Sequence, residues 1–200
     1  MKAWYFSNTD KKLRYGDDRI IQAGKMHTVK GTPELCNHGL HASVRAIDAL
    51  EYAPGSYVWF VDVTRSLDVG EDKICGQRRE YLWGFDADEV LREFARNQAL
   101  INIEKIKHYT DQYDLIVGYL TTGDEGLRSA AELAAELAAR SAAEAAAWSA
   151  AWSAAELAVE SAARSGARSA ANEMLEEMLT DKAKELGHMG GINHVQHIKD

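Results

Sequence analysis

Apolar residues fill almost every position between Ser56 and Val63 (SYVWFVDV), and turn-forming residues bound this segment. β-Branched and aromatic residues in a run of this length predict a strand. Because polar positions hardly interrupt the run, we expect the strand to lie inside a sheet with both faces covered. Shorter strands are predicted around it, at 2–7, 19–23, 26–29, 39–43, 74–77 and 80–84.

Helical spacing of apolar residues appears between these strands. Val44, Ile47 and Leu50 predict a helix with Ser43 as its N-cap, which continues through Tyr52 and ends before Pro54. Two more helices are predicted, one after Asp86 and one after Thr110. Residues 1–120 are therefore predicted to form an α+β domain, a small twisted and mostly antiparallel sheet with inserted and appended helices.

The second half of the chain has a different pattern. From about residue 121, an alanine-rich repeat of four residues continues to about residue 181, and a capping box at 122–125 precedes it. Alanine is the best helix former, so a long helical arm is predicted for 121–181 and a flexible tail for 182–200. Three arrangements of the arm stay open: one straight helix, a hairpin broken near Gly166, or a coil with another subunit.

The four-residue repeat drifts around the helix, because its period exceeds 3.6 residues. Projection nevertheless places large apolar side chains on one side of the arm, and such a face needs a partner. We predict an interaction surface, with self-association through the arm, at Leu133, Leu137, Trp148, Trp152 and Val159.

Composition narrows the classes of function. The net charge is -8, and no dense stripe of Lys and Arg offers phosphate contacts, so no direct nucleic-acid binding is expected. The two cysteines fit no disulfide framework, and no apolar run is long enough to span a bilayer. These features predict a cytoplasmic protein with reduced thiols and no membrane partner.

Possible metal ligands lie close together at Cys36, His38 and His41. A fourth ligand would have to come from elsewhere, and strand alternation places the two histidines on opposite faces. His194 and His197 lack a neighbouring cysteine or carboxylate in metal-site spacing. We therefore predict no metal site, and expect His41 to hydrogen-bond a backbone carbonyl within a packed core.

The string Gly39-Leu40-His41-Ala42-Ser43, followed by Ala49 and Tyr52, resembles the middle motif of ADP-ribosyltransferases. The string Arg79-Glu80-Tyr81-Leu82 resembles the glutamate-bearing strand of their poly-ADP-ribosyl branch. The resemblance implies NAD as cofactor, with Tyr52 stacking on nicotinamide, Glu80 orienting the ribose or the acceptor, and His41 as a third catalytic candidate. Trp4 and Tyr5 stand where that family carries a first-strand histidine or arginine.

A longer resemblance covers nearly the whole chain, through GLHAS, ALEYAPG, DKICGQRREYLWGFDADEVLREFA and GYLTTGDEGLRSAAELAAELAA. It is similar to an uncharacterised family found in phages and prophages, whose members join such a domain to an alanine-rich tail. The resemblance implies a phage accessory protein in an infected bacterium. We predict that it acts by protein–protein contact, on itself and on a host or defence protein, without a cofactor. An NAD-dependent transferase is the alternative.

Overall fold

The computed structural model describes residues 1–149 and 156–188 of the chain. The fold is α+β, as the sequence predicts. The chain divides into two compact units. Unit 1 comprises Met1–Leu91 and the chain from Asn172, and unit 2 comprises Arg92–Ala171. The division therefore does not fall at residue 120, where the sequence predicted the domain to end.

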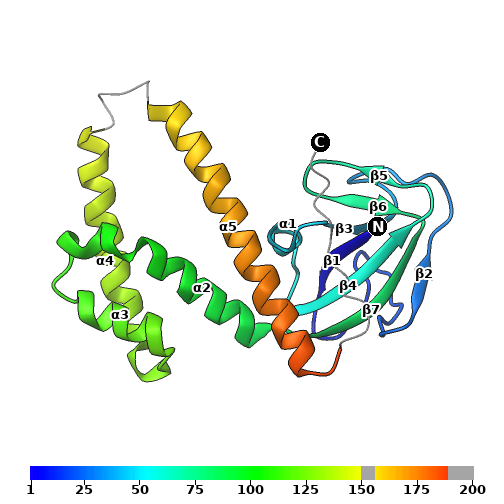
Figure 1. The fold of residues 1–200 in the computed structure, drawn as a ribbon, viewed down its shortest axis with the longest axis horizontal. Helices are drawn as coiled ribbons and strands as arrows, with labels where there is room; N and C mark the ends of the chain where they lie inside the picture. Colours follow the sequence, from blue (N-terminus) through cyan, green and yellow to red (C-terminus); the bar gives the residue numbers. More distant parts are fainter. Residues whose placement is uncertain (150–155, 189–200) are drawn as a thin grey trace. The chain divides into compact units, whose positions relative to one another are not determined.

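The core of unit 1 is a four-stranded antiparallel sheet (Figure 1). Its strand order is β1-β4-β7-β2. The strands are β1 (Lys2–Ser7), β4 (Tyr57–Thr64), β7 (Arg78–Asp86) and β2 (Met26–Thr28). The prediction for the apolar run is confirmed, since β4 has a neighbour on each side and is buried along most of its length.

A second, three-stranded sheet has the order β3-β6-β5 and is also antiparallel. It is formed by β3 (Leu40–Ala42), β6 (Ile74–Gly76) and β5 (Asp68–Val69). Two sheets thus stand where the sequence predicted one. The strand predicted at 19–23 is wrong, because this segment contributes only the single bridge between Lys12 and Ile20.

A β-bulge in β7 decides which side chains share a face of the larger sheet. Trp83 pairs with Phe60 and Tyr81 pairs with Val61, so Leu82 is an extra residue that has no pairing partner on β4. Without a bulge, residues two apart on a strand point to the same face. The extra residue reverses this rule locally and turns Tyr81 and Trp83 to opposite faces.

The two faces differ in chemistry. One face, here called the aromatic face, carries the rings of Trp4, Phe60, Trp83 and Phe85, which pack edge to face or stacked with centroids 5.0–6.1 Å apart. The other, here called the polar face, carries buried side chains around Trp59 and Tyr81, with Tyr5 and Tyr57 against them. The hydroxyl groups of Tyr5, Tyr57 and Tyr81 and the buried guanidinium of Arg79 therefore lie on the polar face.

Helix α1 (Ala46–Glu51) begins later than predicted. Ser43 is not its N-cap, because its backbone N–H and carbonyl pair with Trp4 of β1. No side chain next to the helix caps it. The caps come from α5 (Glu156–Glu185): Asn172 Oδ1 accepts the Ile47 N–H and Glu176 Oε1 accepts the Ala46 N–H, both at 3.1 Å.

Unit 2 consists of packed helices. They are most of α2 (Asp88–Asn102), the 3₁₀ segment η1 (Ile103–Tyr109), α3 (Tyr113–Thr122), α4 (Glu125–Ser149) and the first half of α5. The cap of α4 is not the predicted Thr122: Gly123 ends α3 with φ +66, and Asp124 Oδ1 accepts the Gly126 N–H at 2.8 Å. Buried alanines on one side of α4 are Ala131, Ala134 and Ala138.

Helix α5 passes through Gly166 without a break, so the hairpin broken near this glycine, one of the three arrangements left open, is not formed. Its second half belongs to unit 1, where Leu175, Leu179 and Ala183 are fully buried. The helix continues to Glu185, so the predicted flexible tail does not begin at residue 182. Just beyond it, the His188 ring stacks on Trp83, 6.1 Å between centroids, on the aromatic face.

No helix within residues 1–149 and 156–188 combines the length and the apolar character that a membrane crossing requires.

Candidate functional site: a cationic cavity in unit 1

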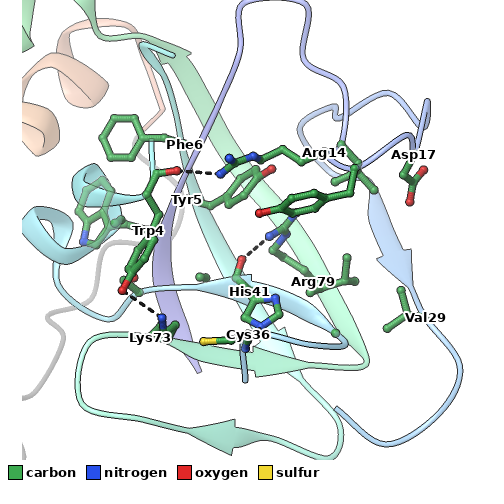
Figure 2. Close-up of a pocket in the computed structure, with 18 of the residues that line it drawn as sticks. Trp4, Tyr5, Phe6, Arg14, Asp17, Val29, Cys36, His41, Lys73 and Arg79 are labelled. Carbon is green, nitrogen blue, oxygen red and sulfur yellow. Dashed lines mark hydrogen bonds between the residues drawn. The ribbon is translucent and has the colours of Figure 1, made fainter. Parts of the chain in front are cut away.

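A cavity of about 550 Å³ opens beside β1 and β3 in unit 1 (Figure 2). Its walls come from β1, β3, the segment at 13–19, the loop at 36–39, the end of α1 and the residue before β6. Among residues 1–149 and 156–188, four cationic side chains line it, against a single carboxylate, that of Asp17. The cations are Arg14, Arg19, Lys73 and Arg79. A cavity of this size and charge is suited to a small organic anion.

Arg79 is the most deeply placed of the four cations, with only 2% of its surface exposed. Its Nε and Nη2 donate to Tyr81 Oη at 3.0 and 2.8 Å, and its Nη1 donates to the His41 carbonyl. The guanidinium also lies 3.7 Å from the centroid of the Tyr5 ring. These contacts fix the guanidinium in place, yet none of them is with a carboxylate.

A buried histidine completes the contacts of Tyr81. His27 Nδ1 lies 3.2 Å from Tyr81 Oη, which already accepts two N–H groups of Arg79. The tyrosine proton therefore points at His27 Nδ1, and the imidazole proton sits on Nε2, which has no hydrogen-bond partner among the described residues. Burial, and then the nearby cations, lower the pKa of His27 to about 4, so the ring is neutral at pH 7.

Tyr52 lies at the end of α1 and is contacted by cations at both of its ends. Arg14 Nη1 donates to its backbone carbonyl at 3.0 Å, and Lys73 Nζ donates to its hydroxyl at 3.0 Å. The hydroxyl in turn donates to Asp72. The hydrogen bond to Tyr52 is the first cause that raises the pKa of Lys73, so this amine is charged at neutral pH.

The segment that carries Arg14 also supplies Tyr15, Asp17 and Arg19 to the cavity. Arg19 and Asp17 form a salt bridge at 2.6 Å, which neutralises both charges and lowers the pKa of Asp17. Tyr15 is 93% exposed and has φ +61, a left-handed conformation that costs free energy for a residue with a Cβ.

His41 and Cys36 form the wall opposite this segment. The Cys36 N–H donates to His41 Nε2 at 3.2 Å, and burial is the first cause that lowers the pKa of His41. His38 is directed elsewhere, with Nε2 2.5 Å from the Lys30 carbonyl. One ring nitrogen of His38 and one of His41 are therefore already hydrogen-bonded to the backbone.

The three residues that the sequence proposed as catalytic do not come together. Tyr52 and His41 both line the cavity, whereas Glu80 does not. Glu80 pairs with Asp62 and Met26 in the sheet, one residue out of phase with Arg79, so its side chain points to the other face of β7. A transferase site that uses Tyr52 and Glu80 together is not assembled.

The predicted interaction surface of the arm is only partly described. Leu133 and Leu137 of α4 are 59% and 54% exposed, on the side of the helix away from its buried alanines. Trp152 lies outside the described residues, and so do the side chains of Trp148 and Val159.

Sequence reasoning missed the cations that define the cavity. The burial of Arg79 could have been predicted, because strand alternation places it on the same side as the buried Tyr81. Lys73 and Arg14 gave none, since they lie outside the regular elements and their contacts with Tyr52 join residues 21 and 38 positions apart.

Comparison with protein-family models, with curated proteins and with solved structures found no match for this chain.

Proposed function

We propose that unit 1 binds a small organic anion in this cavity, with Arg79 as its anchor. The observation that carries the proposal is a guanidinium buried to 98% that contacts no carboxylate of the residues that the structure describes. A buried charge without a counter-charge costs several kcal/mol of folding free energy. That cost is offset when an anionic ligand enters, and ligand binding is then strongly favoured at this position.

The ligand class connects this proposal with the NAD hypothesis. NAD is an anion with aromatic rings, and Tyr52 and His41 stand at the cavity where such a ligand would lie. The geometry does not support a transferase reaction on NAD, because Glu80 points to the opposite face of β7. Binding of an anion, and not transfer catalysed through Glu80, is the function that the geometry supports best.

Calorimetric titration of the full chain with NAD, AMP and inorganic phosphate tests the proposal. We expect at least one of these anions to bind, and Arg79→Met to weaken the binding about 10- to 100-fold, the value of a charge-assisted hydrogen bond. The matched control is Lys11→Met: Lys11 also lies over a tyrosine ring, 4.3 Å from that of Tyr57, but outside the cavity. Absence of binding at millimolar concentration, or equal affinities of the two variants, would contradict the proposal.

A direct assay separates binding from catalysis. The protein is incubated with NAD, and free nicotinamide is measured by chromatography for the wild type and for Glu80→Ala. If binding is the whole function, neither protein releases nicotinamide. Release by the wild type that is lost in Glu80→Ala would replace the binding proposal with a transferase.

A second function, contact with another protein through α4, is favoured by Leu133 and Leu137. Two leucines exposed by more than half on a helix whose alanines are buried form an apolar surface suited to a protein partner. We propose that the arm associates with a second copy of the chain, and that a phage protein of this design contacts a host or defence component in the same way.

Native mass measurements over a range of concentrations test self-association. We expect the full chain to exceed the mass of a monomer, and Leu133→Glu with Leu137→Glu to return it to the monomer. The matched control, Leu133→Met with Leu137→Met, keeps the apolar surface and should leave the mass unchanged. A wild type that stays monomeric at high concentration would exclude self-association.

A further inference from the structure

Three cations of the cavity share one unusual environment, in which each lies over a tyrosine ring that also lines the cavity. Arg79 is 3.7 Å from the centroid of Tyr5, Lys73 is 4.4 Å from that of Tyr52, and Arg14 is 5.1 Å from that of Tyr15. A ring face stabilises a cation through its quadrupole but carries no net charge. Each pair therefore holds a cation in place and leaves its full charge available.

Salt bridges do not neutralise these three charges. Within the described part of the chain, Arg14, Lys73 and Arg79 form none, in contrast to Arg19, which is paired with Asp17 at 2.6 Å. The comparison with Arg19 matters, because all four cations line the same cavity. Asp17, already paired, does not compensate these charges. Asp72, whose carboxylate accepts the Tyr52 hydroxyl, attracts Lys73 but does not line the cavity.

The three charges also stand at separate places. Arg14 and Lys73 contact opposite ends of Tyr52, the carbonyl and the hydroxyl, and Arg79 is held by the carbonyl of His41 on β3. Figure 2 shows the three side chains entering from different directions, with Arg14 from the segment at 13–19, Lys73 beside Cys36 and Arg79 below Tyr5. One compact anion meets only one of these positions well.

From this arrangement we infer that the ligand carries several linked phosphate groups, as in a nucleoside polyphosphate. The inference rests on the proposed anion-binding function and specifies it. Guanidinium groups bind phosphate oxygens in a bidentate manner, and an ammonium group adds a compact point charge for a second phosphate. Arg79 takes one phosphate, and Lys73 and Arg14 take the others at the two ends of Tyr52.

A ligand series tests the number of phosphates. The full chain is titrated calorimetrically, without divalent cations, with phosphate, pyrophosphate, tripolyphosphate, ADP and citrate. We expect affinity to rise about tenfold or more from phosphate to pyrophosphate and again to tripolyphosphate. Comparing the affinities for ADP and pyrophosphate shows whether a nucleoside adds affinity or whether the polyphosphate alone is the ligand. Citrate, a polycarboxylate, should bind more weakly than tripolyphosphate.

Variants assign the phosphates to residues. Lys73→Met and Arg14→Met should each lower the affinity for tripolyphosphate about tenfold and leave that for single phosphate unchanged, whereas Arg79→Met should lower both. Lys11→Met, the cation over Tyr57 outside the cavity, should change neither. Far-ultraviolet circular dichroism of every variant shows whether the fold is kept, and any unfolded variant is replaced by the Gln substitution.

The outcomes separate the two proposals. If no anion of the series, NAD or AMP binds, the anion-binding function fails and this inference fails with it. If phosphate binds and longer chains bind no better, or if citrate equals tripolyphosphate, anion binding stands and the polyphosphate inference is overturned. It is also overturned if Lys73→Met and Arg14→Met bind tripolyphosphate as the wild type does.

Discussion

The two faces of the four-stranded sheet are formed by the same strands, but one is a packing face and the other adjoins the cavity. The aromatic face is filled by Trp4, Phe60, Trp83 and Phe85, and His188, just beyond the end of α5, stacks on Trp83. The polar face buries Arg79 and His27, and the cavity adjoins it. Both faces are well buried, so burial alone does not distinguish a packing face from a binding face.

The two faces differ in whether their buried polar and charged groups have partners within the protein. Aromatic rings on the first face pack against one another through edge and stacking contacts, and the unpaired polar group described there, the Trp83 indole N–H, carries no charge. On the second face a guanidinium lacks a counter-charge, and His27 Nε2 lacks an acceptor within the described residues. A buried charge without a counter-charge costs more free energy than an unpaired indole N–H, so the polar face is where a ligand would be favoured. Three predictions probe this contrast, in order of decreasing effect.

The aromatic face should control stability. Trp83→Ala removes a ring that is 3% exposed and contacts Trp4, Phe60 and Phe85, so we expect a loss of about 3–5 kcal/mol in the free energy of unfolding. Urea denaturation measures it. Trp83→Phe is the matched control: it keeps a stacked ring and removes an indole N–H that has no acceptor among the described residues, so it should cost far less. Equal losses would mean that ring packing is not what this face contributes.

The polar face should make stability depend on pH. Because the pKa of His27 falls from 6.5 to about 4 on folding, the unfolded chain takes up a proton that the folded chain resists. Stability should therefore decrease as the pH falls from about 6.5 to about 4, by about 3 kcal/mol. Urea denaturation across this range measures the effect, as the difference between the wild type and His27→Asn, whose amide oxygen still accepts the Tyr81 hydroxyl. Parallel curves for the two proteins would show that His27 does not titrate as described.

The segment that contains α5 links the two faces, since α5 caps α1 and His188, just beyond the helix, stacks on Trp83. Asn172→Ala removes the cap of Ile47, and we expect a loss of about 1 kcal/mol. Because α1 ends at Tyr52, anion affinity measured by calorimetry should fall as well. Glu176→Gln keeps its acceptor oxygen and serves as the control, while unchanged affinity in Asn172→Ala would confine the role of α5 to stability.

Local sequence signals predicted the regular elements well and their connections poorly. The run from Ser56 to Val63 and the aromatic segment at 2–7 are strands because their own residues favour that conformation. Ser43 was expected to cap α1 from local chemistry, but pairing with Trp4 uses its backbone instead. Tertiary pairing of this kind overrides a local preference and leaves no trace in the nearby sequence.

The candidate site was predicted in part for the same reason. Tyr52 and His41 lie in a recognisable string, and both line the cavity. The catalytic role of Glu80 was predicted from the residues next to it in the sequence. Strand alternation, however, places Arg79 on the same face as the buried Tyr81 and Glu80 on the opposite face. The charges at Arg14 and Lys73 meet Tyr52 only because separate segments fold against one another, and no spacing rule in the sequence encodes that meeting.

The bulge at Leu82 divides β7 into two segments whose alternation is opposite. Before it, Arg79 and Tyr81 point to the polar face, and after it, Trp83 and Phe85 point to the aromatic face. If β7 had no bulge, Leu82 would pair with Phe60, every later residue would move by one position, and Trp83 and Phe85 would turn toward the face of Tyr81. Deletion of Leu82 would instead leave Tyr81 opposite Val61 and Trp83 opposite Phe60, so both faces would keep their side chains. In this strand, the register with β4 decides the face on which each residue lies.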